Sequence, residues 1–243
     1  MSELFSIQLQ NRQQQSSDGV WLDLSTTTEQ VQAALRQIGI SSDNPQGLFI
    51  SGYFAEEEKR FAIPYNMVLA SNVDELNFLA SRLETLSTGE RAELNAALQA
   101  PQSELFSIGR ITDFPENVDY YVHLPDVHGP AQLGDYYLNR SGMVDMPEEW
   151  KGGIDTAQFG RYVAQQEQGA FTQYGYLVKS GDEWQKVHEG QPVPEEYRVL
   201  SFPAPEVLRD AANIPPPVQP ETEPQKVIPI ILNGKDSAER MKE

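Results

Sequence analysis

The chain of 243 residues has no cysteine, only three histidines, and half as many basic as acidic residues. Without cysteine there can be no disulfides, thiolate metal sites or cysteine nucleophiles, and a reducing compartment is the natural setting. No apolar run is long enough to span a bilayer. The N-terminus has neither the basic start nor the apolar core of a signal peptide. We therefore expect a soluble, cytoplasmic protein with no membrane contact.

The charge balance is strongly one-sided, with 36 Asp and Glu against 18 Lys and Arg and a formal net charge of −18. Such a field repels nucleic acids and anionic membranes and attracts basic surfaces. No cluster of Lys and Arg is present to neutralise phosphates, so direct nucleic-acid binding is disfavoured. An acidic balance is also common in ordinary soluble proteins, so charge alone does not identify a function.

The usual signatures of catalysis are missing as well. The chain has no phosphate-binding loop, dinucleotide fingerprint, nucleophile elbow or HExxH zinc motif. His123 and His128 flank Asp126, but their spacing favours an exposed loop over a metal site. The pairs Glu148-Glu149 and Glu195-Glu196 could suggest glycosidase chemistry, although adjacent carboxylates point in different directions. We expect no enzyme, cofactor or metal; a hydrolase with paired carboxylates in a deep pocket remains the alternative.

The first seventy residues have the pattern of a small sheet covered by one helix. Alternating apolar residues or short apolar runs predict three strands, at residues 5–9, 20–24 and 48–54. Between the second and third strands, Thr26 and Glu29 have the spacing of a capping box that opens a helix. Residues 61–70 give no clear assignment.

Two helices are predicted next. Asn72 with Glu75, and Ser87 with Glu90, have capping-box spacing, and each pair precedes apolar residues at helical intervals. Two helices joined this closely are expected to form an antiparallel pair. Residues 105–112 fit either a strand or a short helix.

The rest of the chain alternates between helix and strand signals before it becomes rich in proline. The predicted elements are a strand at 117–124, a helix from Pro130 to Gly142, a helix capped by Asp155, a hairpin around Gly175 and a strand at 197–202. From residue 203 the proline content favours a linker or tail.

Several motifs, in order, resemble the ArdA antirestriction family over about residues 4–180. They are Gly19-Val20-Trp21-Leu22-Asp23, Asp74-Glu75-Leu76-Asn77, Glu93 to Leu98, Gly134-Asp135-Tyr136-Tyr137, Ile154-Asp155, Phe159-Gly160-Arg161 and Gly169 to Gly175. Each motif alone is weak, and their common order is more specific. Sequence from Asp182 onward has no counterpart in the short members of that family.

The resemblance implies an elongated α+β protein of three small subdomains that forms a homodimer. We expect an N-terminal α+β subdomain at 1–70, a helical one at 71–115, a C-terminal α+β one at 116–202, and a Pro-rich tail at 203–243. In function, it implies a non-enzymatic mimic of B-DNA that occupies the DNA-binding subunit of type I restriction-modification enzymes and protects mobile DNA such as plasmids and conjugative transposons. The alternative is an ArdA-like adaptor that recruits a basic partner on a mobile element.

The candidate surface follows from the resemblance and from the charge run around it. The family's antirestriction motif corresponds to residues 133–150, and the stretch from 113 to 155 is interrupted by only two basic residues, Arg140 and Lys151. Within it, Asp155 is better explained as a helix cap. The candidate acidic residues are Asp113, Glu116, Asp119, Asp126, Asp135, Asp145, Glu148 and Glu149. The candidate dimer contacts, from the family's third part, are Phe159, Tyr162, Phe171, Tyr174 and Tyr176.

Overall fold

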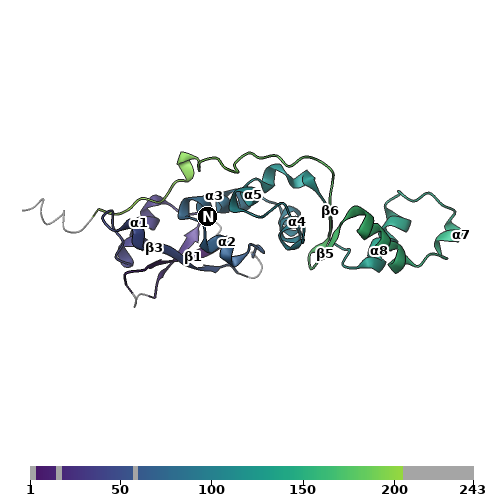
Figure 1. Ribbon diagram of the computed structural model, residues 1–243, viewed down its shortest axis with the longest axis horizontal. Helices are drawn as coiled ribbons and strands as arrows, with labels where there is room; N and C mark the ends of the chain where they lie inside the picture. The colour runs from purple at the N-terminus through teal and green to yellow at the C-terminus, as the bar shows by residue number, and fades with distance from the viewer. Residues whose placement is uncertain (1–3, 15–17, 57–59, 205–243) are drawn as a thin grey trace, which may run out of the picture. The chain divides into compact units, whose positions relative to one another are not determined.

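The computed structural model describes residues 4–14, 18–56 and 60–204, and confirms the predicted α+β class. It contains two three-stranded antiparallel sheets, with strand orders β2-β1-β3 and β4-β6-β5. Figure 1 shows three helices between them: α3 (Val73–Glu84), α4 (Thr88–Gln99) and α5 (Ile108–Thr112). The strands are β1 (Phe5–Asn11), β2 (Val20–Leu24), β3 (Leu48–Phe54), β4 (Tyr121–Leu124), β5 (Ala170–Thr172) and β6 (Gly175–Lys179).

The first sheet is covered by α1 (Thr28–Gln37), as the alternation predicted. The capping box of α1 is formed by Thr27 and Gln30, so the predicted pair Thr26 and Glu29 was wrong by one residue. The shift has a tertiary cause: the Thr26 N–H donates to Asn77 Oδ1 at 2.7 Å. The backbone before α1 is therefore held by a residue of α3, which is far away in the sequence.

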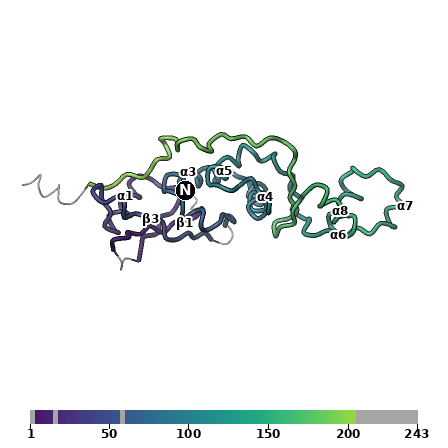
Figure 2. Tube along the Cα trace, in the orientation of Figure 1, coloured from purple at the N-terminus to yellow at the C-terminus, as the bar shows by residue number. Residues whose placement is uncertain are grey.

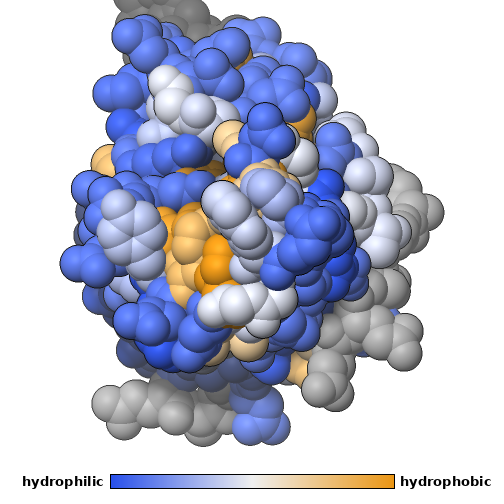
Figure 3. Space-filling view, turned by 90° about the vertical axis from the view of Figure 1, so that its right-hand side faces the viewer, coloured by the Kyte–Doolittle hydropathy of each residue, from blue (hydrophilic) through white to orange (hydrophobic). Residues whose placement is uncertain are grey.

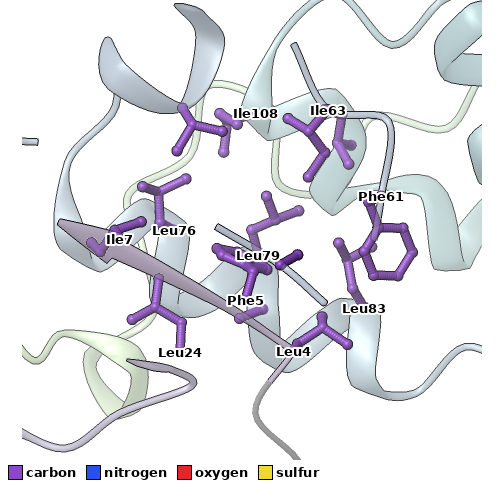
Figure 4. Close-up of a cluster of buried hydrophobic side chains, with 14 of the residues drawn as sticks. Leu4, Phe5, Ile7, Leu24, Phe61, Ile63, Leu76, Leu79, Leu83 and Ile108 are labelled. Atoms are coloured by element: carbon purple, nitrogen blue, oxygen red, sulfur yellow. The ribbon is translucent and has the colours of Figure 1, made fainter. Parts of the chain in front are cut away.

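Both predicted caps of the middle helices are confirmed. Asn72 and Glu75 open α3 (Val73–Glu84), and Ser87 and Glu90 open α4 (Thr88–Gln99). The leucines of α3 are fully buried and meet apolar side chains of β1 and β2, as Figure 4 shows. The main packing partners of the two helices differ: α3 packs against α5 (Ile108–Thr112) and β2, and α4 against β4 and β6. One hydrophobic cluster therefore extends from the first sheet to the second.

Three stretches differ from, or add to, the sequence prediction. The unassigned region contains α2 (Tyr65–Leu69). The stretch 105–112, which fitted either a strand or a short helix, contains the short helix α5 over its last five residues, Ile108–Thr112. The strand expected at 117–124 is shorter, because Val118–Tyr120 forms a 3-10 turn closed by the Tyr120 N–H donating to the Asn117 carbonyl. Only Tyr121–Leu124 then pairs with β6.

Residues 129–169, which we call the α6–α8 lobe, pack around a second, small cluster that includes buried Leu133 and Tyr176. Pro130 opens the first helix and Asp155 caps the last, as predicted. The helices α6 and α8 cross closely at two glycines. A Cβ on Gly134 would lie 1.9 Å from the Thr156 carbonyl oxygen, and one on Gly160 would lie 1.8 Å from that of Pro130. The lobe contains α6 (Pro130–Asp135), a π-helical turn (Tyr136–Arg140), α7 (Glu148–Lys151) and α8 (Thr156–Glu167).

After β6, residues 180–204 form what we call the C-terminal strap. Figure 2 shows it returning past α5 and α3 towards α1. Its one helical segment in the described part is a 3-10 helix, Glu195–Tyr197. The predicted strand at 197–202 is therefore wrong: the N–H groups of Val199 and Leu200 donate to the Asp74 carboxylate and not to a neighbouring strand. The predicted Pro-rich tail lies, apart from Pro203 and Ala204, outside the described residues.

Candidate functional site

Four of the candidate carboxylates are exposed, and within the described ranges they form no hydrogen bond or ion pair. Asp119 lies in the 3-10 turn before β4, and Asp126 in the turn after it. Asp145 lies in the loop before α7, and Glu149 in α7 itself. We call these four the unpaired carboxylates. Their charge is available to a partner without breaking an existing contact.

Three other candidates share their charge with a neighbouring cation. Glu116 is paired with Arg82, and Glu148 with Lys151 at 2.9 Å. Asp135 accepts hydrogen bonds from the Asn139 amide and the Arg140 guanidinium, and both lower the pKa of this carboxyl. The Asp135–Arg140 pair and the Glu148 carboxylate are exposed to solvent, so these contacts hold their geometry weakly. A basic partner would have to compete with these cations.

Asp113 has a different environment from the rest of the set. Its side chain is 0% exposed. Its oxygens accept the backbone N–H groups of His188 at 2.6 Å and Glu189 at 3.2 Å. This carboxylate holds the C-terminal strap, so the surface that we propose below does not include it.

The residues considered for catalysis are dispersed. Glu148, Glu149, Glu195 and Glu196 are all exposed, and none of the four lines the cavities of about 680 and 440 Å³. His123 contacts the Tyr174 carbonyl oxygen at 2.7 Å. The part of the chain that the structure describes contains no group of three or more His, Asp or Glu suited to a metal ion.

The aromatic candidates for a dimer contact divide by exposure. Tyr162 is 59% exposed, and Phe159, Phe171 and Tyr174 are partly buried. Tyr176 is fully buried, and burial raises the pKa of its hydroxyl. That hydroxyl donates to Glu167, as does the hydroxyl of Tyr137. Tyr176 therefore belongs to the interior of the lobe, and Tyr162 is the candidate best placed for contact.

Two exposed side chains of the α6–α8 lobe were not among the sequence candidates. Met143 is 75% exposed and Trp150 is 66% exposed, both close in sequence to the unpaired carboxylates Asp145 and Glu149. Figure 3, which views this end of the molecule, shows an apolar patch surrounded by hydrophilic surface. The motif residues 133–150 gave a signal for the acids, but nothing in their spacing distinguished exposed from buried apolar residues.

None of the helices in residues 4–14, 18–56 and 60–204 has the length and hydropathy to cross a membrane. Comparison with known families matches the chain to a model described as "Antirestriction protein (ArdA)" over residues 14–178. This range is more than half of the chain and contains the unpaired carboxylates and the whole α6–α8 lobe. The C-terminal strap lies beyond it. No curated protein matches the chain.

Proposed function

The chain belongs to the ArdA antirestriction family, and we propose that it counters type I restriction-modification enzymes by occupying their DNA-binding site. Its function is antirestriction, as the family implies. The proposal that it occupies the DNA-binding site rests on one observation. The unpaired carboxylates are exposed and lie within the range that matches the family: Asp119, Asp126, Asp145 and Glu149. The protein would act without catalysis, in the cytoplasm, in defence of incoming mobile DNA.

The physical basis is the charge of DNA itself. Duplex DNA carries about one negative charge per 1.7 Å of its axis, and proteins that bind it line their channels with Lys and Arg. Fixed carboxylates can occupy the same cationic channel and draw on the same electrostatic attraction. The net charge of −18 adds long-range attraction towards such a channel.

We further propose that a second copy of the chain contacts the α6–α8 lobe. The exposed side chains Tyr162, Met143 and Trp150 would supply apolar contact area, and Phe159, Phe171 and Tyr174 would support it. Aromatic residues and methionine are enriched at such interfaces. Sedimentation of the purified protein at several concentrations tests this point, and a Tyr162→Ala change should weaken self-association.

The direct test is competition with DNA. A purified type I methyltransferase bound to its labelled recognition duplex is titrated with the protein while salt is varied. If four carboxylates replace phosphates, the inhibition constant, after correction for the affinity of the DNA at each salt concentration, should weaken about a hundredfold between about 50 and 200 mM salt. Inhibition that does not change with salt would contradict phosphate mimicry.

A matched pair of variants separates position from total charge. Asp126→Asn, Asp145→Asn and Glu149→Gln together remove three unpaired carboxylates. The control, Asp182→Asn with Glu195→Gln and Glu196→Gln, removes three exposed carboxylates from the C-terminal strap. Both variants change the net charge of −18 equally. We expect the first to lose inhibition and the control to retain most of it; equal losses would favour a general charge effect.

A further inference from the structure

Side chains of the helices bind the backbone of the C-terminal strap, and the contacts on α3 show how. Asp74 Oδ1 accepts the N–H groups of both Val199 and Leu200 at 2.7 Å. One turn along α3, the Asn77 amide donates to the Tyr197 carbonyl oxygen at 3.1 Å. An Asp and an Asn three residues apart lie on one face of a helix. Together they bind backbone N–H and C=O groups of three residues within the segment 197–200.

The end of α5 repeats this arrangement. Asp113 accepts the N–H groups of His188 and Glu189. Asn117 binds both backbone groups of Gln185, donating to its carbonyl oxygen at 3.0 Å and accepting from its N–H at 2.7 Å. Both side chains are buried, so these bonds are shielded from water. The strap is therefore bound at two separate points by side chains of one chemical kind.

Side-chain contacts accompany these backbone bonds and add selectivity. Val199 is 5% exposed and belongs to the main hydrophobic cluster. Glu189 is paired with the buried Arg110 at 3.0 Å. Between the two points, residues 190–193 line a cavity of about 680 Å³ together with Phe78 and other residues of the helices. The middle of the strap is thus supported less than its two ends.

We propose that this face of α3 and α5 is a binding site for a peptide of irregular backbone, occupied in the native chain by its own residues 185–200. The site recognises two adjacent backbone N–H groups at each of two points, an apolar side chain at the position of Val199, and a carboxylate at the position of Glu189. When the strap is displaced, the same face accepts a separate peptide of this kind. The inference does not depend on how the protein inhibits restriction.

The test uses the full-length chain with a weakened strap. Val199→Asp introduces a charge at a buried position of the strap and leaves Asp74, Asn77, Asp113 and Asn117 intact. A fluorescent peptide with the unchanged sequence of residues 183–202 is then titrated against this variant and against the unchanged chain. We expect at least tenfold tighter binding to the variant, because in the unchanged chain the site is already filled.

Two further variants complete the design. Adding Asp74→Ala and Asp113→Ala to Val199→Asp should reduce peptide binding at least tenfold, while adding Asp119→Asn, which touches no strap residue, should not. Hydrogen exchange should show faster exchange at residues 197–200 and unchanged protection in β1. If Val199→Asp fails to fold, Val199→Ala replaces it. Equal binding to both chains, no binding to either, or unchanged exchange in the strap would overturn the proposal.

Discussion

The substitution Gly134→Ala tests whether the close crossing of α6 and α8 holds the α6–α8 lobe together. A Cβ at this position would lie 1.9 Å from the Thr156 carbonyl oxygen and 2.7 Å from its carbon. Ordinary contact begins at 3.4 Å, so the two backbones would have to separate by the difference, 3.4 − 1.9 = 1.5 Å. Because the obstructing atoms belong to a helix backbone, no side-chain rotation can relieve the overlap.

The expected magnitude follows from the packing around this crossing. Inserting one methyl group into a packed interior costs about 1–3 kcal/mol, and the upper part of the range applies where backbone must move. Separating the helices also loosens Leu133, which is fully buried between them. We expect about 3 kcal/mol, or roughly a hundredfold in the opening equilibrium of the lobe. The main hydrophobic cluster includes no residue of α6 or α8, so the rest of the chain should stay folded.

Hydrogen exchange followed by mass spectrometry measures this local opening directly. Peptides of α8 should exchange much faster in Gly134→Ala, and peptides of β1 and α3 should not change. The control is Gly152→Ala in the same lobe, at helical φ of −64° with nothing within 4 Å of its added Cβ. If α8 keeps its protection in Gly134→Ala, the crossing does not require glycine and the reasoning fails.

Two further predictions concern single carboxylates. Burial, with help from Glu90 and Asp119, raises the pKa of Glu93 to about 8, so the folded state binds an extra proton and stability should fall as pH rises from about 4.5 to 8. Urea denaturation at both ends of this range measures the change in the free energy of unfolding with pH. Glu93→Gln should make this change smaller, and the exposed control Asp126→Asn should not. If Glu93→Gln leaves the change as it is, the Glu93 side chain is solvated in the folded protein. Asp155 accepts the N–H groups at the start of α8, so Asp155→Ala should destabilise the lobe by about 1 kcal/mol, measured as faster hydrogen exchange in α8. Asp155→Asn can still cap the helix and should retain most of the stability that Asp155→Ala loses. If it does not, capping is excluded as the cause.

Local signals in the sequence were sufficient for most elements of the fold. The capping boxes at Asn72 and Ser87, the Asp155 cap and the hairpin at Gly175 depend on residues a few positions apart, so they could be predicted. The predictions for the start of α1 and for residues 197–202 were wrong because a side chain distant in the sequence accepts a backbone N–H group there. Asn77 binds the N–H of Thr26, and Asp74 binds that of Val199; neither contact leaves a trace in the local pattern.

The candidate site was predictable only as a set of residue types. The excess of acids from 113 to 155 is visible in the sequence, but burial and pairing are not. Asp113 and Asp126 look alike in the chain, yet one is buried under the strap and the other is exposed. The buried one is explained by residues seventy-five positions away, His188 and its neighbour. The residues next to Asp113 in the sequence give no sign of this hydrogen-bond partner.

The residues behind the family resemblance therefore fall into two groups with different physical roles. Gly134, Gly160 and Asp155 build the α6–α8 lobe through a close helix crossing and a cap. Asp145 and Glu149, in the same stretch, contribute nothing visible to its packing and present charge to solvent. A chain could keep the first group, and with it the fold, while losing the second. Under the proposed function, inhibition of a DNA-binding enzyme should depend on the unpaired carboxylates, and the two glycines should affect it through Asp145 and Glu149, which lie in the lobe that they build.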